Sequence, residues 1–145
     1  MWGNLNDEGI QRITKLQKRA ARIILDAPFL TPTRELFENL NWLSFCDGIS
    51  YNKLVLVYKI LHDKTPNYLK KLCIPSSEVH TRNLRSVSSN NLAVIRPNIA
   101  IMKKSFAYSS AILWNKLPCN IKLSASLSIF KSKYFTYLRH FKLRH

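Results

Sequence analysis

The sequence predicts a mainly α protein, a small helical domain of about five or six helices. Three observations favour this class. Apolar side chains recur at helical spacing in several segments, residues suited to helix starts precede those segments, and 46% of the residues are apolar, which is enough for a core. Because the chain has 145 residues, we expect residues 1–145 to form a single domain. It would have an N-terminal half at 1–75 and a basic C-terminal half at 79–145.

The first expected helix covers residues 6–25 and is amphipathic. Asn6 or Asp7 is placed to cap it, and Pro28 is expected to end it. With residues set at about 100° intervals, its basic side chains form a stripe about 120° wide, whose ordinary interpretation is a solvated outer face. No acidic residue interrupts the stripe, so we expect no ion pair one turn apart there. The apolar side consists of Ile10, Ile13, Leu16, Ala20, Ile23 and Ile24, and the basic stripe consists of Arg12, Lys15, Lys18, Arg19 and Arg22.

A short second helix is expected after Thr31-Pro32. Threonine is a good N-cap, and proline suits the first helical position because its missing N–H would have no helical partner there. This helix would turn Leu36, Phe37 and Leu40 inward.

The third expected helix covers residues 45–62. Ser44 and Asp47 resemble a capping box with Asp in the place of Glu. Its apolar residues spread almost all round the axis, which places it in the middle of a core. The β-branched Val55 and Val57 leave a strand as the alternative, but the length of the segment favours a helix.

The next part of the chain is expected to be less regular. The Thr65-Pro66 pair repeats the cap-and-proline signal before a short turn, and residues 76–92 are rich in Ser and Asn, which indicates a loop. Residues 92–97 would form a short strand, with 84–87 as its partner. We therefore expect a short β-hairpin or an extended segment near 82–97.

Two helices are expected in the C-terminal part. One covers residues 103–115 and is broken by Leu117-Pro118, and the last begins at Ser124 or Ser126. The apolar stripe of the last helix is aromatic, and we interpret it as core rather than as a stacking surface for bases. The inward residues of the first of these helices are Phe106, Ile112, Leu113 and Trp114, and those of the last are Leu127, Phe130, Tyr134, Tyr137, Leu138 and Phe141.

Charge is distributed unevenly along the chain. The 23 basic and 8 acidic side chains give a net charge of +15. Residues 1–78 hold 11 basic and all 8 acidic side chains, whereas residues 79–145 hold 12 basic side chains and no acidic one. A field of one sign attracts polyanions, of which nucleic acid is the commonest. A charge that serves only solubility is the alternative, and an anionic membrane comes last, so we expect no membrane partner.

The candidate nucleic-acid-binding residues are basic side chains that would hold RNA or DNA phosphates without reading sequence. Phe106 and Tyr108 follow two of them and have the aromatic rings needed to stack on single-stranded bases. The candidates are Arg12, Lys15, Lys18, Arg19, Arg22, Arg82, Arg85, Arg96, Lys103 and Lys104.

Catalytic chemistry is not expected. The eight carboxylates form no close pair beyond Asp7-Glu8, and three glycines are too few for a phosphate-binding loop. We expect no catalytic residue, no metal and no cofactor. The scattered candidates for such roles are Cys46, Cys73, Cys119, His62, His80, His140 and His145, and no C-x-x-C pair occurs among them.

The first residues do not have the composition of a signal peptide, and no apolar run is long enough to span a bilayer. The unpaired cysteines suit a reducing compartment. We therefore expect an intracellular protein, in the nucleus or the cytoplasm.

Several short motifs resemble, in order and spacing, the tail that follows the polymerase module in jockey-like LINE (non-LTR) retrotransposon reverse transcriptases. The resemblance covers nearly the whole chain. The motifs are Trp2-Gly3, Leu16-Gln17-Lys18-Arg19-Ala20-Ala21-Arg22-Ile23-Ile24, Thr31-Pro32-Thr33 with Leu36, Trp42-Leu43, Tyr58-Lys59-Ile60-Leu61, Thr65-Pro66-Asn67-Tyr68-Leu69, Thr81-Arg82-Asn83, Lys104-Ser105-Phe106, Leu113-Trp114-Asn115-Lys116-Leu117-Pro118 and Phe130-Lys131.

The resemblance implies kinship with RNA-directed DNA polymerases, but the catalytic aspartate pair of such enzymes has no counterpart here. It therefore implies a non-catalytic fragment that contributes general nucleic-acid binding. A structural module that packs on a polymerase thumb, or a relic without a selected role, is the alternative.

Overall fold

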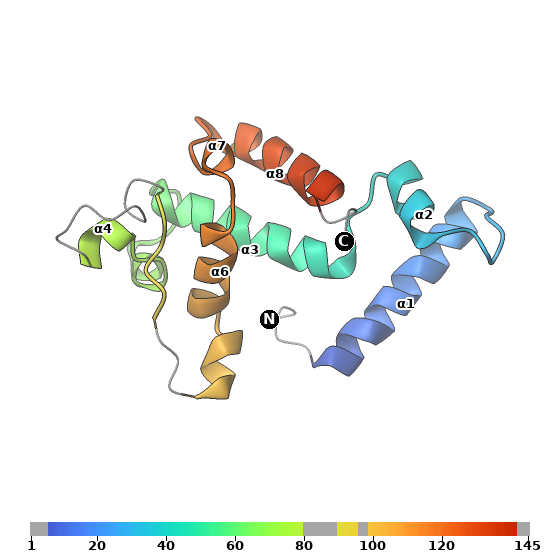
Figure 1. Cartoon of the computed structure of the whole chain (residues 1–145), viewed down its shortest axis with the longest axis horizontal. Coiled ribbons are helices and arrows are strands. Elements are labelled where there is room, and N and C mark those ends of the chain that lie inside the picture. The colour runs from blue at the N-terminus through green and yellow to red at the C-terminus, as the bar shows by residue number, and fades with distance from the viewer. Residues whose placement is uncertain (1–5, 80–89, 96–98, 142–145) are drawn as a thin grey trace. The chain divides into compact units, whose positions relative to one another are not determined.

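The computed structural model describes residues 6–79, 90–95 and 99–141, and this part of the chain is mainly helical (Figure 1). The predicted fold class is therefore confirmed. The elements are α1 (Asp7–Ile24), α2 (Thr33–Asn39), α3 (Phe45–Leu61), the 3₁₀ helix η2 (Asn67–Leu72), α4 (Ser76–Val79), the 3₁₀ helix η3 (Ala100–Lys104), α6 (Phe106–Asn115), α7 (Cys119–Lys122) and α8 (Leu127–Phe141).

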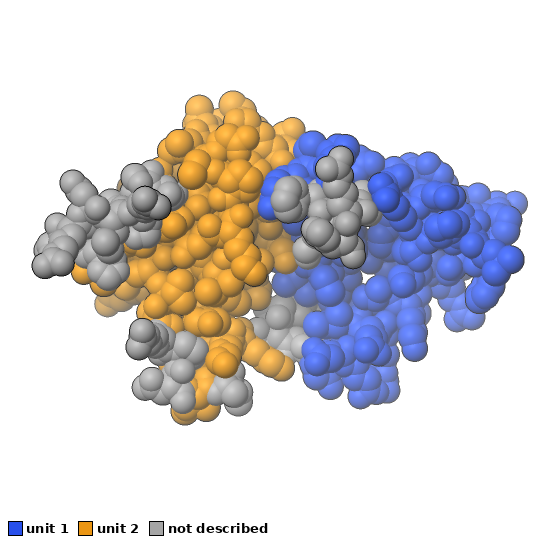
Figure 2. All heavy atoms as spheres, in the orientation of Figure 1, with its two compact units in different colours: residues 1–49, 136–145 blue, residues 50–135 orange. Residues whose placement is uncertain are grey.

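The chain divides into two compact units, which Figure 2 colours separately. Unit 1 comprises residues 1–49 and 136–145, and unit 2 comprises residues 50–135. The C-terminal segment joins unit 1 through Arg139, whose guanidinium donates to Asn41 Oδ1 and to the Glu38 carbonyl. The units therefore do not coincide with the halves distinguished by charge.

Both ends of α1 lie within one residue of the predicted bounds, 6–25. The Asn6 side chain accepts a hydrogen bond from Gly9 N at 2.9 Å, which caps the helix. The helix stops at Ile24, before Pro28 is reached, because Asp26 adopts a left-handed conformation with φ of 47° and Ala27 N then bonds back to Arg22 O at 3.0 Å. This arrangement is a Schellman motif, in which glycine usually holds the left-handed position.

The same motif ends α2 and α3. Asn41 and Asp63 each have φ of 54°. The residue after each of them returns a hydrogen bond to the preceding helix, from Trp42 N to Phe37 O and from Lys64 N to Lys59 O, both at 2.9 Å. Asp or Asn at these positions replaces the glycine signal by which helix ends are recognised in sequences.

The predicted roles of the threonine–proline pairs were wrong by one position. Pro32 and Pro66 themselves occupy the N-cap positions of α2 and η2, and neither cap has a side-chain hydrogen bond. Both prolines have φ of −57° with an extended ψ, and proline's fixed φ favours this geometry. Thr31 and Thr65 therefore precede the caps.

The packing of α1 differs from its apolar pattern. Its most buried residue is Ala21, which is 0% exposed, and Gln17 Nε2 donates to Leu43 O at 2.8 Å on the same side. The apolar Leu16 and Ile23 are 63% and 75% exposed. A small residue and a hydrogen-bonded amide thus form the packed face, and part of the apolar side of α1 is exposed.

The core of unit 2 forms around α3 and α8. As predicted, α3 buries residues on all sides, and Phe130 and Tyr134 of the aromatic stripe of α8 are buried in this core. The Phe130 ring is 0% exposed and lies 4.5 Å from the Tyr58 ring and 5.9 Å from the Trp114 and Tyr134 rings, measured between centroids. Tyr58 also donates its hydroxyl hydrogen to Ser124 O at 2.6 Å.

The extended segment of unit 2 has a different partner from the expected one. Leu92 forms an isolated antiparallel bridge with Pro75, supported by hydrogen bonds from Ala93 N to Ile74 O and from Ser76 N to Asn91 O. The predicted partner, 84–87, lies outside the described residues. The loop expected from residue 76 begins instead with the helical turn α4.

The helix expected from residue 103 begins later, at Phe106. Ser105 caps it by accepting from Tyr108 N at 3.3 Å, and the two lysines before Ser105 belong to η3. In α8, Ser126 rather than Ser124 acts as the cap, because its Oγ accepts from Ile129 N at 3.2 Å.

Candidate nucleic-acid interface

The basic stripe of α1 contains one ion pair that was not expected. Arg12 Nη2 lies 2.6 Å from Glu8 Oε1, one turn earlier in the helix, and both side chains are largely exposed. The expectation of an unpaired stripe was therefore wrong at its first member, since Glu8 precedes the stripe but is within reach of it. Lys15 and Arg19 are exposed.

The two remaining residues of the stripe are half-buried. The Arg22 guanidinium lies 5.3 Å from the centroid of the Phe29 ring, at cation–π distance, and its Nε is buried without a hydrogen-bond partner. Lys18 lines a pocket of unit 1. The accessible cations of α1 are thus Lys15, Arg19 and the ion-paired Arg12.

The candidates beyond residue 78 fall into two groups. Lys103 and Lys104 are exposed in η3, one residue before α6. Arg82, Arg85 and Arg96 lie outside the described residues. Phe106 and Tyr108, proposed as stacking residues, are half-buried in the first turn of α6.

Unit 2 carries most of the positive charge. It holds 14 basic and 2 acidic side chains, a net charge of +12, whereas unit 1 holds 9 basic and 6 acidic, a net charge of +3. In the described part of unit 2 every basic side chain is a lysine. The exposed ones are Lys64, Lys70, Lys71, Lys103, Lys104, Lys116, Lys131 and Lys133.

Unit 1 contains a pocket of about 370 Å³ that the sequence did not indicate. The rings of Phe37 and Trp42, 6.3 Å apart, form part of its wall. Its lining includes Lys18, Arg34 and Arg139, but also the carboxylates of Glu38 and Asp47. Arg34 Nε lies 2.9 Å from Glu38 Oε1. These three cationic and two anionic side chains leave a formal charge of +1 in the lining.

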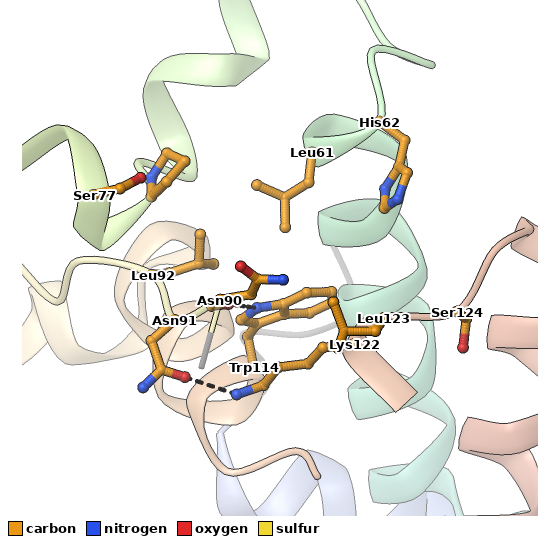
Figure 3. A pocket seen from close by; sticks show the side chains of 11 residues that line it. Leu61, His62, Ser77, Asn90, Asn91, Leu92, Trp114, Lys122, Leu123 and Ser124 are labelled. Carbon is orange, nitrogen blue, oxygen red and sulfur yellow. Dashed lines mark hydrogen bonds between the residues drawn. The ribbon is translucent and has the colours of Figure 1, made fainter. Parts of the chain in front are cut away.

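Unit 2 contains a pocket of about 360 Å³ with a buried lysine in its wall (Figure 3). Lys122 is 4% exposed, and its Nζ donates to Asn91 Oδ1 at 2.7 Å and to Asn115 O at 3.4 Å. Burial lowers the pKa of the Lys122 ammonium, and interaction with Cys119 opposes this shift. His62 lines the same pocket; its Nδ1 lies 2.9 Å from the Tyr58 carbonyl.

The wall of this pocket is fixed by hydrogen bonds between α6 and the extended segment. Trp114 Nε1 donates to Asn90 O at 2.9 Å. The Asn115 side chain accepts from Leu92 N at 2.8 Å and donates to Leu92 O at 2.9 Å, as a neighbouring strand would. Lys122 and Asn91 are 31 residues apart in the chain, and no spacing in the sequence relates them.

In the ranges that the structure describes, no group of three or more His, Cys, Asp or Glu side chains is placed to hold a metal ion. No helix of the described residues has both the length and the apolar character needed to cross a membrane.

No protein-family model, curated protein or solved structure matches this chain.

Proposed function

We propose that this chain is a non-catalytic fragment of the C-terminal tail of a LINE-type reverse transcriptase, and that it binds RNA or DNA through the phosphate backbone. The observation that carries the binding proposal is the net charge of unit 2, which contains 14 basic side chains and only 2 acidic ones. Asp63, one of the two, is already paired with Lys70 at 2.6 Å. Such a field concentrates polyanions at the surface.

The kind of cation supports binding without sequence preference. Lysine ammonium groups act as point charges on phosphate, whereas arginine has the planar fork that reads guanine edges. Because 11 of the 14 basic side chains of unit 2 are lysines and three are arginines, we infer contacts mainly to the backbone rather than to bases.

The proposed origin is supported by the places of the motif residues in the fold. Residues from separate motifs of the resemblance meet in the structure. Gln17 bonds to Leu43 O, and the Tyr58 and Trp114 rings pack on Phe130. Residues of these motifs therefore make contacts that stabilise the fold, and a related tail with the same fold would need the same contacts.

The binding proposal is tested by titrating the full chain with RNA and DNA over a series of salt concentrations. Affinity should fall as salt rises, and each duplex phosphate that is neutralised adds about 0.9 to the slope of log affinity against log salt. Random-sequence and defined-sequence duplexes should bind alike. Absence of binding at low salt would contradict the proposal.

Matched variants show which cations contribute. Lys103→Gln and Arg19→Gln should each weaken binding and lower the salt slope by roughly 0.9 per lost phosphate contact. Lys70→Gln and Arg12→Gln remove the same charge from residues already paired with Asp63 and Glu8, so they should have smaller effects. Equal effects in all four variants would indicate that only net charge matters.

The proposed origin has a separate test in the flanking genomic sequence. An upstream reading frame that encodes a polymerase with an aspartate pair, in frame or interrupted by a stop codon, is expected. A flanking region without any trace of such a frame would contradict the origin and leave the binding proposal unchanged.

A protein-interaction module is the second candidate, favoured by the exposed apolar side chains of unit 1. Leu16, Ile23 and Ile24 of α1 and Phe29 and Leu30 after it are 58% to 89% exposed. Clusters of this kind commonly mark interaction sites. If they contact a polymerase thumb, Ile23→Ser should weaken binding to a polymerase that lacks its own tail, whereas Gln11→Ser should not.

A further inference from the structure

Two large apolar side chains occupy the tip of the turn between α1 and α2. A hydrogen bond from Thr31 N to Pro28 O at 3.0 Å closes the turn, which makes Phe29 and Leu30 its two central residues. Small or polar residues such as glycine, asparagine, aspartate and serine dominate turn positions. Here the two side chains are 83% and 89% exposed. Because exposed apolar area is unfavourable in water, such a turn tip has the character of a contact surface.

The end of α1 extends this apolar surface. Leu16 and Ile23 lie on the same side of the helix, since seven residues nearly complete two turns. Both of them and Ile24 are more than half exposed. The Arg22 guanidinium lies 5.3 Å from the centroid of the Phe29 ring, so the turn lies beside this end of the helix. The apolar cluster of unit 1 is defined as Leu16, Ile23, Ile24, Phe29 and Leu30.

Cations border the apolar cluster along the helix. Arg12 and Leu16 are one turn apart, as are Arg19 and Ile23, so the members of each pair are neighbours on the helix surface. All four side chains are exposed. Arg12 is also paired with Glu8 at 2.6 Å. The exposed side of α1 therefore presents positive charge and apolar area next to each other.

We propose that this surface binds an anionic lipid membrane. The apolar cluster would enter the interface, and the cations of α1 would lie at the level of the phosphate groups. Residues 12–30 contain five basic side chains and one acidic side chain, Asp26, which gives them a net charge of +4. Helices that lie in the membrane interface combine buried apolar area with attraction between their cations and anionic lipids in this way.

Other occupants would use this surface less fully. Nucleic acid would pair with the cations, but four of the five residues of the apolar cluster are aliphatic and lack the ring that stacks on a base. A second copy of the chain would bring the same cations face to face. The expectation of no membrane partner rested on charge and on the length of the apolar runs, and neither indicates which apolar side chains the fold leaves exposed.

The proposal does not depend on nucleic-acid binding, which was assigned to the charge of unit 2, and it gives the apolar cluster an occupant other than a polymerase thumb. Co-sedimentation of the full chain is measured with vesicles of phosphatidylcholine alone and with vesicles that also contain phosphatidylserine. The chain should bind the anionic vesicles and bind the neutral ones at least tenfold more weakly, because the α1 cations contribute only to the former. Equal binding to both kinds would overturn the proposal.

A first pair of variants tests the apolar cluster. Phe29→Ser combined with Leu30→Ser should weaken binding to the anionic vesicles roughly tenfold or more, because two apolar side chains no longer enter the interface. Leu123→Ser combined with Ile129→Ser removes two exposed apolar side chains of unit 2 and should leave vesicle binding unchanged. Equal binding by the two double variants would overturn the proposal, since it would show adsorption by charge alone.

A second pair of variants tests the position of the cations. Lys15→Gln combined with Arg19→Gln should weaken binding to the anionic vesicles roughly tenfold or more, because each removes a cation close to the lipid surface. Lys116→Gln combined with Lys131→Gln removes the same charge from exposed lysines of unit 2 and should cost less. Equal losses would show that net charge, and not this surface, holds the chain on the vesicle.

Insertion of the turn is measured separately, with vesicles that contain brominated lipid. The fluorescence of Phe29→Trp should be quenched more strongly than that of Ile129→Trp, and the three native tryptophans contribute the same background to both variants. Equal quenching would overturn the proposal. Absence of vesicle binding, together with weaker polymerase binding by Ile23→Ser, would assign the apolar cluster to a protein partner instead.

Discussion

Units 1 and 2 are stabilised in different ways. Of the sixteen buried apolar residues that the structure describes, thirteen belong to unit 2 and three to unit 1, namely Ala21, Leu36 and Leu138. Unit 1 has a net charge of +3 and two ion pairs, each of which joins two residues one helical turn apart. Unit 2 has a net charge of +12. Self-repulsion destabilises a compact state. Unit 2 therefore combines the larger core with the charge that works against folding.

The contrast suggests a division of roles between the two units. The well-packed aromatic core of unit 2 stabilises the fold and so offsets the cost of its high positive charge and of its polar pocket. Unit 1 has little core of its own and leaves Leu16, Ile23, Phe29 and Leu30 exposed, so its stability depends more on local features such as caps. Three predictions test this contrast, and they are taken from the largest effect to the smallest.

The largest effect is expected at the centre of the aromatic core. Phe130→Ala should lower the free energy of unfolding by about 3–5 kcal/mol, because it removes a 0% exposed ring that contacts three other aromatic rings. Urea unfolding of the full chain measures the change. Ile129→Ala, at the adjacent position where the side chain is 44% exposed, is the control and should cost much less. Similar losses in both variants would mean that this cluster does not hold unit 2 together.

The core of unit 2 was also the part best predicted from the sequence. In α3 the apolar residues surround the axis, and in α8 they form one aromatic stripe, so each pattern allowed only one kind of packing. The caps at Ser44 and Ser126 were recognised because a hydroxyl before an apolar run has a direct physical role.

Unit 1 and the pocket were predicted less well, for two physical reasons. The packed face of α1 consists of Ala21 and the hydrogen-bonded Gln17, which hydrophobic periodicity does not identify. The pocket depends on Lys122, Asn91 and His62, which meet only through the tertiary fold. Basic residues in the sequence predicted a charge but not a cavity, so the candidate nucleic-acid-binding residues included none of these three, and His62 was noted only as a scattered histidine.

A second prediction concerns the dryness of the unit 2 core at high pH. Burial raises the pKa of the Cys73 thiol from 9.0 to about 11, and a hydrogen bond with Ser110 opposes this. Between pH 9 and 11 the thiol ionises in the unfolded chain but not in the folded one, so the free energy of unfolding should fall by on the order of 2 kcal/mol as pH rises through that window.

This loss is measured as the difference in pH dependence between the unmodified chain and Cys73→Ala, which should lack it. Cys46→Ala removes an exposed thiol of unit 1 and should keep the pH dependence of the unmodified chain. Thiol-labelling reagents at pH 8 should modify Cys46 and Cys119 well before Cys73. Rapid labelling of Cys73 in the folded chain would show that the core of unit 2 is open to water.

The smallest effect is expected at a helix end of unit 1. Asp26 has φ of 47°, a conformation that glycine adopts without strain, so Asp26→Gly should stabilise α1 by about 0.5–1 kcal/mol after the added freedom of the unfolded chain is deducted. Hydrogen exchange at the α1 amides should slow roughly two- to fivefold. Asn41→Gly relieves a similar strain but removes the Oδ1 atom that accepts from Arg139, so it should gain less or nothing. The Asp26→Gly substitution acts on the helix cap alone. Slower exchange in α1 without any change at the Tyr58 amide would show that unit 1 opens separately from unit 2. Equal slowing at both places would show that the two units unfold together and that they do not differ in stability.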